Sequence, residues 1–343
     1  MNKPRAVVIV DGFTVTGRLL TSRFRAQGIS CIGVLSTAEL QTEDLQRHAG
    51  NAGLQEALFE KTIVFTGDPG AVLRELDGYA VIGIIPGSGT GLLLADTLSE
   101  RMNLCTNGTR RSAARFNKFQ MQQTLIDAGV PTKEFILASD EIDLLAWYRS
   151  RRFGEIVIKP ANCASGMEIL FCTSEQEVLQ AFRKLLTTMH ANGEKNAAVL
   201  AEECLVGTEY CVDTVSRDGK HRLAGIRTCR NDVPASYTGD RAREQDTPDE
   251  EQTEVIRYTV SALEALRIRY GAASTRIMMT GKGPLLLNTM AWMHGGTSPC
   301  PVTGDAAHRK ADLVVEAYCD PEGFKRSSVL PAPGSGSVNK PRE

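Results

Sequence analysis

The stretch EIVIKPANCASGME, residues 155–168, holds the residue types in this chain that are best suited to chemistry. Its apolar run Ile156–Ile158 is β-branched and predicts a short buried strand, which would end at Lys159 because Pro160 disfavours regular structure. The residues that follow are small, so backbone N–H groups can approach phosphate oxygens while the ammonium group meets their charge. This pattern fits a polyphosphate site, and it also fits an ordinary surface hairpin.

Composition and charge restrict the class of protein. The chain has 343 residues with 42% hydrophobic content, enough for two or three domains with packed cores. The formal net charge is −2, and the short cluster Arg110, Arg111 and Arg115 is typical of a solvated helix face rather than of a nucleic-acid surface. No apolar run approaches the length of a membrane span. We therefore expect neither nucleic acid nor a membrane as a partner.

The nine cysteines show no metal-binding pattern, because none of them forms a CxxC pair. Cys31, Cys172 and Cys211 lie in apolar runs, where a reduced cysteine packs as a small hydrophobic residue. Reduced thiols are typical of a reducing compartment. We therefore expect a cytoplasmic protein.

The first 105 residues alternate strand-like and helix-like patterns, which predicts a parallel sheet in an N-terminal α/β domain. The expected strands are Ala6–Val10, Ser30–Leu35 and Ala80–Ile85, and the expected helices are Leu19–Gln27 and Leu92–Arg101. Open α/β sheets bind ligands at the carboxyl ends of their strands. The loops Asp11–Gly17 and Gly87–Gly91 therefore either shape a substrate site or only turn the chain.

The rest of the chain predicts a mixed α+β portion in two lobes, residues 106–195 and 196–320. The first lobe would contain a helix over 112–129 that carries Lys118, and a later helix that begins with a capping box at Ser174. The second lobe would contain strand hairpins and one long helix. Residues 321–343, which include the segment PAPGSGS, have the composition of a disordered tail.

Four features follow one another in a specific order: Lys118 in a helix, the strand–lysine–loop around Lys159, the acidic strand AEECLVGTEYCVD, and the hairpin GPLLLNTMAWMHGG. This order resembles the ATP-grasp superfamily of carboxylate–amine ligases, and within it the members that join amino acids into dipeptides. The resemblance covers residues 6 to about 320. It implies an N-terminal pre-ATP-grasp domain with a parallel sheet, followed by a two-lobed ATP-grasp domain.

The resemblance implies ATP as the cofactor, amino-acid-like substrates, a role in specialised biosynthesis and a homodimer. Such ligases transfer the γ-phosphate of ATP to a carboxylate, and an amine then attacks the acyl phosphate. Lys118 and Lys159 would contact the phosphates from two sides, beneath a lid formed by residues 161–166. The other implied nucleotide contacts are Ser165 and Gly166 in the lid, Glu202 with the backbone of Glu203 to Leu205 at the adenine edge, and Glu209 at the ribose.

The metal-binding end departs from the family pattern. Phosphoryl transfer uses Mg²⁺, which carboxylates hold between the β and γ oxygens. Where family members place two acids, an amide or small residue, and an arginine, this chain has Arg276, Asn288, Met290 and Trp292. Asn288 can coordinate a metal ion through its carbonyl oxygen but brings no charge. Arg276 places a permanent cation where Mg²⁺ would need an anion.

Three interpretations follow from these departures. In the first, the protein is a ligase in which Arg276 neutralises phosphate in place of one metal ion, assisted by Glu202, Glu209, Asp213 or His294. Arg276, Asn288 and His294 are then the candidate catalytic residues. In the second, it is a nucleotide-binding homologue with a regulatory or partner-binding role. In the third, Arg276 and Trp292 build a new pocket for a metal-independent reaction. We expect weak or absent dependence on Mg²⁺.

Overall fold

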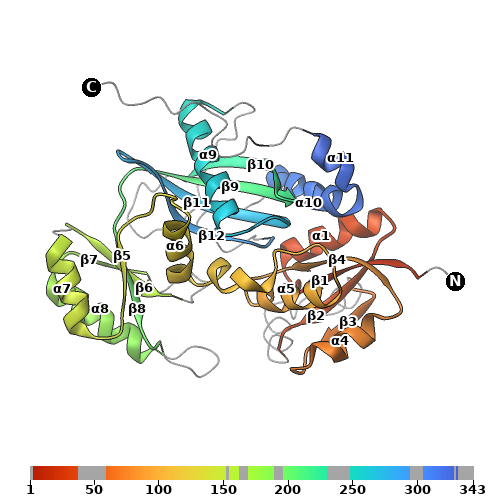
Figure 1. Cartoon of the computed structure of the whole chain (residues 1–343), viewed down its shortest axis with the longest axis horizontal. Helices are drawn as coiled ribbons and strands as arrows, with labels where there is room; N and C mark the ends of the chain where they lie inside the picture. The colour runs from red at the N-terminus through yellow and green to blue at the C-terminus, as the bar shows by residue number, and fades with distance from the viewer. Residues whose placement is uncertain are drawn as a thin grey trace.

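The computed structural model describes residues 3–37, 59–151, 154–161, 169–188, 196–229, 248–293, 304–327 and 330. These residues form three four-stranded sheets, which belong to three parts of the molecule (Figure 1). An N-terminal domain and a small lobe lie at opposite ends of the long axis, and the sheet of a second lobe lies between them. This arrangement confirms the expected combination of a parallel-sheet domain with a two-lobed domain.

The N-terminal sheet is parallel, as predicted. Its elements are β1 (Arg5–Val10), α1 (Val15–Ala26), β2 (Ser30–Leu35), β3 (Lys61–Val64), α4 (Pro69–Leu76), β4 (Ala80–Pro86) and α5 (Leu92–Arg101). The strand order is β3-β2-β1-β4, and residues 6–10 of the central β1 have no solvent exposure. Helix α1 packs on one face of this strand, and α4 and α5 pack on the other. Burial on both faces explains why β1 is apolar from residue 6 to residue 10.

The second sheet forms lobe A. Its elements are β5 (Phe135–Ala138), α7 (Glu141–Arg151), β6 (Ile156–Pro160), β7 (Leu170–Cys172), α8 (Glu175–Thr187) and β8 (Val199–Glu203). The strand order is β5-β8-β6-β7, and every pair is antiparallel. Helices α7 and α8 pack against Ile156 and Ile158 on one face of the sheet. The other face carries the charged side chains of Lys159 and Glu202 beside apolar ones such as Phe135, whose ring packs on Phe119 of the chain before β5.

Two boundaries in lobe A differ from the prediction. The border between the lobes was placed at residue 196, but β8 pairs with both β5 and β6, so lobe A extends to Glu203. Pairing with strands more than 40 residues away leaves no local signal in the sequence. Strand β6 also continues through Pro160. Among the described residues, β7 pairs with Ile156–Ile158, so Pro160 lies beyond these pairs, near the end of the strand.

The third sheet forms lobe B. Its elements are β9 (Thr208–Arg217), β10 (Lys220–Cys229), α9 (Glu250–Ala265), β11 (Gly271–Thr280), β12 (Gly283–Met290), α10 (Gly304–Cys319) and α11 (Pro321–Arg326). The strand order is β10-β9-β11-β12, in antiparallel pairs. Helix α9 packs on the face that carries Tyr210 and Ile277. Helix α10 packs against Val215 on the opposite face and also contacts α1 of the N-terminal domain.

The predicted tail begins too early. Residues 321–326 form α11, in which the Phe324 side chain has no solvent exposure. The Arg222 guanidinium of β10 lies 4.9 Å from the centre of this ring. Composition did not reveal the helix, because a single aromatic residue is buried here by elements that are distant in sequence.

The helix predicted over 112–129 begins later than expected. Helix α6 spans Lys118–Asp127, and the side chain of its N-cap residue Asn117 accepts a backbone hydrogen bond. Two short 3-10 turns, 109–111 and 113–115, precede it. Lys118 is therefore the first residue of the helix rather than a residue in its middle.

The prediction of a solvated arginine cluster is wrong for Arg115, which is fully buried. Its guanidinium lies 2.8 Å from the Asp96 carboxylate of α5 and donates to the Leu266 carbonyl, next to α9, at 3.2 Å. The Ser112 hydroxyl donates to the same carboxylate at 2.5 Å. This buried network joins the N-terminal domain to lobe B.

The cysteines agree with the expectation in part. Cys31, Cys172 and Cys211 are free and buried, and burial raises the pKa of the Cys31 thiol to about 12. Cys229, at the end of β10, departs from the expectation because it is disulfide-bonded. No helix within the described ranges is long and apolar enough to cross a membrane.

Replacing His221 with glutamine is expected to flatten the pH dependence of stability in weak acid. His221 lies on β10 with 3% exposure, and burial lowers its pKa from 6.5 to about 4. As the pH falls, the unfolded state therefore binds a proton at His221 at a higher pH than the folded state does. Stabilisation present above pH 6.5 is therefore lost as the pH falls towards 4, by about 3 kcal/mol in total. Urea unfolding at pH 7 and pH 4.5 measures the difference.

The matched control for this prediction is His308→Gln, which changes an exposed histidine of α10. That variant should keep the wild-type pH dependence. Equal pH dependence in wild type and His221→Gln would show that His221 does not contribute.

Candidate nucleotide cleft

Two charged side chains of lobe A lie on the sheet face opposite the one that packs against α7 and α8. Ile156 and Ile158 contact the helices, so strand alternation directs Lys159 to the other face. There the Lys159 ammonium nitrogen lies 2.5 Å from Oε2 of Glu202 on β8, and the two side chains are 9% and 2% exposed. The implied phosphate lysine and the implied adenine carboxylate therefore form one buried ion pair.

Glu202 has a second cationic partner, which the sequence analysis did not identify. Lys133, two residues before β5, lies 2.9 Å from the same Oε2. Burial favours the neutral acid, but the charges of Lys133 and Lys159 outweigh it and hold the pKa of Glu202 below its usual value. The other oxygen, Oε1, is buried without a hydrogen-bond partner among the described residues. Glu202 is thus an ionised carboxylate with one oxygen available as an acceptor.

Lys118 lies close to the end of β6. Its backbone N–H donates to the Ala161 carbonyl at 2.8 Å, so the first turn of α6 meets the chain just after Lys159. The two implied phosphate lysines are therefore in one region of the fold. This placement supports a shared phosphate site, which stays a prediction.

Of the other implied nucleotide residues, some lie outside the described residues and some have a defined place. Ser165 and Gly166 lie outside the described residues. Glu203 is half-buried and, by strand alternation, lies on the face opposite Glu202. Leu205 is half-buried in the connection between β8 and β9. The chain at 203–205 therefore passes from lobe A to lobe B, where its backbone groups can border a nucleotide.

Lobe B also has a polar face, opposite the one that packs against α9. Tyr210 and Ile277 pack towards α9, so alternation places Glu209 and Arg276 on the other face. The Arg276 Nε lies 2.6 Å from Oε1 of Glu209. Asn288 of β12 pairs in register with Arg276 of β11. Three of the implied site residues therefore lie together, and the implied ribose carboxylate already holds a guanidinium.

The residues at this place do not fit a Mg²⁺ site. Mg²⁺ binds hard oxygen ligands, mostly carboxylates. Across the described part of the chain, no group of three or more His, Cys, Asp or Glu side chains could hold a metal ion. Asn288 supplies one neutral oxygen, and Arg276 opposite it supplies a fixed positive charge. His294, the candidate acid–base residue, lies outside the described residues.

A second buried ion network lies on the same face of lobe B, where α10 covers the sheet. Asp213 of β9 lies 2.8 Å from the Lys310 ammonium of α10 and 2.8 Å from the Arg227 guanidinium of β10. Lys310 has no solvent exposure and also donates to the Ser274 hydroxyl at 2.5 Å. Lys310 was not predicted as a buried residue, because a lysine in a helix is usually solvated. Its position on the apolar face of α10 was the available signal.

Trp292 packs against the N-terminal domain. Its side chain is 7% exposed, and a Cβ built on Gly89 would lie 3.0 Å from the indole and 3.0 Å from Phe116. Glycine therefore lets the loop between β4 and α5 approach the indole. The Met293 carbonyl accepts a hydrogen bond from the Thr16 hydroxyl at 3.0 Å. Both loops that could shape a substrate site thus meet the chain just after β12.

Asp11 ties the same strand-end loops together. It is 4% exposed and has a φ of 53°. Its carboxylate accepts hydrogen bonds from the Ser36 N–H and hydroxyl, both at 2.7 Å, and from the Thr90 hydroxyl at 2.6 Å. These contacts favour a structural role for Asp11, which holds the edge of the sheet in shape.

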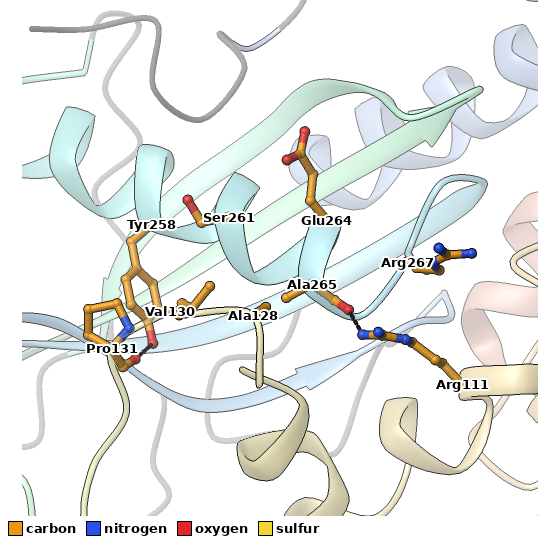
Figure 2. A pocket seen from close by; sticks show the side chains of 10 residues that line it. Arg111, Ala128, Val130, Pro131, Tyr258, Ser261, Glu264, Ala265 and Arg267 are labelled. Carbon is orange, nitrogen blue, oxygen red and sulfur yellow. Dashed lines mark hydrogen bonds between the residues drawn. The ribbon is translucent and has the colours of Figure 1, made fainter. Parts of the chain in front are cut away.

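A separate pocket of about 470 Å³ lies beside α9, at the turn between α6 and β5 (Figure 2). The Tyr258 hydroxyl donates to the Pro131 carbonyl at 2.6 Å, and Arg111 donates to the Ala265 carbonyl. Helix α9 packs on the face of lobe B opposite Glu209 and Arg276. The pocket therefore lies away from the implied nucleotide residues and contains none of them.

Two antiparallel lobes with charged inner faces, beside a parallel N-terminal sheet, define an ATP-grasp protein. The chain belongs to this family, because residues 116–292, more than half of its length, match the ATP-grasp (A) domain of phosphoribosylglycinamide synthetase. Its sequence is similar to those of curated amino-acid ligases, which agrees with a place among the carboxylate–amine ligases.

The chain is 29% identical over 331 residues to dapdiamide A synthase of Enterobacter agglomerans, covering 94% of this chain and 76% of the relative. The fold is similar to the crystal structure of an L-amino acid ligase from Bacillus licheniformis, with a TM-score of 0.68, 16% identity, and coverage of 93% and 75%. It is also similar to the ADP complex of an N5-carboxyaminoimidazole ribonucleotide synthetase, with a TM-score of 0.67, 14% identity, and coverage of 93% and 78%.

Proposed function

We propose that this protein binds ATP between the Lys159–Glu202 pair of lobe A and the Arg276–Glu209 pair of lobe B and uses it to join two amino-acid-like molecules. The carboxylate of the first molecule attacks the γ-phosphorus, releases ADP and becomes an acyl phosphate. The amine of the second attacks the acyl carbon, loses a proton and releases phosphate. The observation that carries the proposal is the buried Lys159–Glu202 pair, which combines a phosphate-binding cation with an open carboxylate oxygen.

Charged side chains of the two lobes lie close enough to influence each other. Burial is the main cause that lowers the pKa of Lys133 in lobe A to about 8, and the charge of Arg276 in lobe B contributes to the shift. The lobes also approach each other at their connection, where an exposed Lys282 of lobe B lies 4.0 Å from Glu203 of lobe A. A ligand between the faces would therefore contact charges from both lobes.

We assign no metal ion to this site, because the described residues around Arg276 and Asn288 do not fit one. Arg276 supplies a permanent positive charge on the face of the lobe B sheet opposite α9. Lys118 and Lys159 would supply charges from the side of lobe A. Such fixed cations can neutralise a triphosphate without a divalent ion. Arg276 would exchange its contact with Glu209 for a phosphate oxygen, which leaves Glu209 for the ribose hydroxyls.

ATP is expected to stabilise the protein to the same extent with and without Mg²⁺. A ligand at 100 times its dissociation constant adds about 2.7 kcal/mol to the free energy of unfolding. Thermal unfolding with ATP in EDTA, and with ATP and Mg²⁺, measures the two cases at equal ionic strength. A stabilisation that appears only with Mg²⁺ would contradict the assignment of Arg276 and Asn288.

Replacing Arg276 and Asn288 together with glutamate is expected to create metal dependence. The two new carboxylates would lie in register on β11 and β12, near Glu209, and would offer Mg²⁺ anionic oxygens. The matched control is the pair of changes Arg276→Gln and Asn288→Gln, which adds no charge. ADP release should then rise with Mg²⁺ only in the glutamate variant. If ADP release by the two variants responds equally to Mg²⁺, Arg276 and Asn288 do not lie at the phosphate end of the proposed ATP site.

A second candidate function is nucleotide binding without turnover. The specific observation that favours it is the Arg276–Glu209 contact, which occupies the implied ribose carboxylate and neutralises it. Release of ADP in the presence of ATP and some pair of amino acids supports the ligase. Stabilisation by ATP without ADP release across a panel of all such pairs supports the binding protein.

We also propose that the protein is cytoplasmic and forms a homodimer. Light scattering after size-exclusion chromatography tests the second point directly, since a dimer has twice the mass of the 37.3 kDa chain. A mass of one chain at micromolar concentration would rule the dimer out.

A further inference from the structure

Lys133 occupies a position that the proposed chemistry leaves without a role. It lies two residues before β5, with its side chain 2% exposed and its ammonium nitrogen 2.9 Å from Oε2 of Glu202. Lys159 reaches the same oxygen from β6 at 2.5 Å. One buried carboxylate oxygen therefore lies between two ammonium groups, although a single cation would neutralise it.

The second cation matters when a nucleotide binds. For Lys159 to contact a phosphate, its ammonium group has to leave Glu202. A carboxylate that is 2% exposed is strongly destabilised when it loses its only counter-ion, and it then takes up a proton. Lys133 is packed inside lobe A and stays at Oε2, so Glu202 keeps its charge. Lys133 thereby frees Lys159 for the phosphate.

The same arrangement orients Glu202. Both ammonium groups lie at Oε2, while Oε1 is buried and has no partner among the residues that the structure describes. An ionised carboxylate only accepts hydrogen bonds. Oε1 therefore suits the amino group of adenine and opposes the carbonyl oxygen that guanine carries at the same position.

We propose that Lys133 is a positioning residue, which keeps Glu202 ionised and so sets the preference of the cleft for adenine over guanine nucleotides. This inference rests on the proposed function, because it requires that the cleft binds ATP. A lysine with only a structural role would affect all nucleotides alike.

The charges around Lys133 make the affinity for ATP depend on pH. The groups that face it are Glu202 of β8, Lys159 of β6, Arg276 of β11 and the Cys204 thiol between β8 and β9. Burial is the main cause that lowers the pKa of Lys133 to about 8, and the negative charge of Glu202 opposes this shift. ATP binding should therefore weaken as the pH rises above about 8, since the proton on Lys133 is lost there.

The test is calorimetric titration of the full chain with ATP and with GTP, in EDTA. Wild type should prefer ATP at least tenfold. Lys133→Met should bind ATP about 30-fold more weakly but GTP nearly as before, because a protonated Glu202 can donate to the guanine carbonyl. Lys184→Met, which changes an exposed lysine of α8, is the matched control and should behave as wild type.

A second measurement keeps the inference testable if Lys133→Met does not fold. Lys133→Arg retains the charge but does not titrate, so its ATP affinity should stay constant from pH 7 to 9.5 while that of wild type falls. Equal losses for ATP and GTP in Lys133→Met, or no loss, would overturn the positioning role alone. Absence of ATP binding to wild type would overturn the proposed function and this inference together.

Discussion

Replacing Lys159 with methionine is expected to weaken ATP binding by about 100-fold. A charge-assisted hydrogen bond contributes about 1.5–3 kcal/mol, and 1.4 kcal/mol corresponds to a factor of ten in affinity. Lys159 is 9% exposed at the end of β6, where its ammonium group can move from Glu202 to a phosphate. Methionine keeps the length of the side chain, so the packing of lobe A should change little.

Two controls separate this effect from general damage. Lys184→Met removes one positive charge from the exposed surface of α8 and should bind ATP as wild type does. Adenosine lacks phosphates, so its affinity should be nearly the same for wild type and Lys159→Met. If Lys159→Met binds ATP normally, Lys159 is only a counter-ion of Glu202, and the proposed phosphate site is wrong.

Replacing Arg115 with methionine is expected to lower the free energy of unfolding by about 3–5 kcal/mol. The Asp96 carboxylate would lose a fully buried guanidinium at 2.8 Å and would keep only hydroxyl donors, such as Ser112. The Leu266 carbonyl would lose a donor as well. Because total stabilities are typically 5–15 kcal/mol, urea unfolding should show a large decrease in the midpoint.

The pH dependence of the Arg115→Met variant identifies the cause. Burial raises the pKa of Asp96 even with Arg115 beside it. Without Arg115 the carboxyl should take up a proton more readily, so the loss of stability should be smaller in acid than at neutral pH. Arg74→Met breaks an exposed pair with Asp68 and should change stability by no more than about 0.5 kcal/mol. If Arg115→Met also changes stability by no more than this, the buried Arg115–Asp96 network does not stabilise the contact between the N-terminal domain and lobe B.

Local sequence patterns predicted helices and strands correctly where the apolar periodicity of the segment, or the residue that caps it, determines the structure. The strand Ser30–Leu35 and the helix Leu92–Arg101 have the predicted bounds. The helix after Ser174 is capped by that side chain, as expected. These features depend on residues close in sequence, so a reader of the sequence alone can find them.

Features that depend on distant partners were missed or misplaced. Strand β8 was assigned to lobe B, Arg115 to the surface, and Lys133 to no role. The role of Lys133 can be recognised only in the folded chain, where its ammonium nitrogen lies 2.9 Å from the carboxylate of Glu202. The two residues are almost 70 positions apart in the sequence. A buried charge is stable only with its counter-ion, and the counter-ion is chosen by the tertiary structure.

The sequence by itself indicated the family and the order of the two lobes, and it predicted that Arg276 and Asn288 stand where the family places acidic residues. These conclusions follow from residue types and their order along the chain. Only the tertiary structure decided that Arg276 contacts Glu209, and that Glu202 lies between Lys133 and Lys159. The physical reason is that charges interact over a few ångströms, and strand register determines which of them come that close.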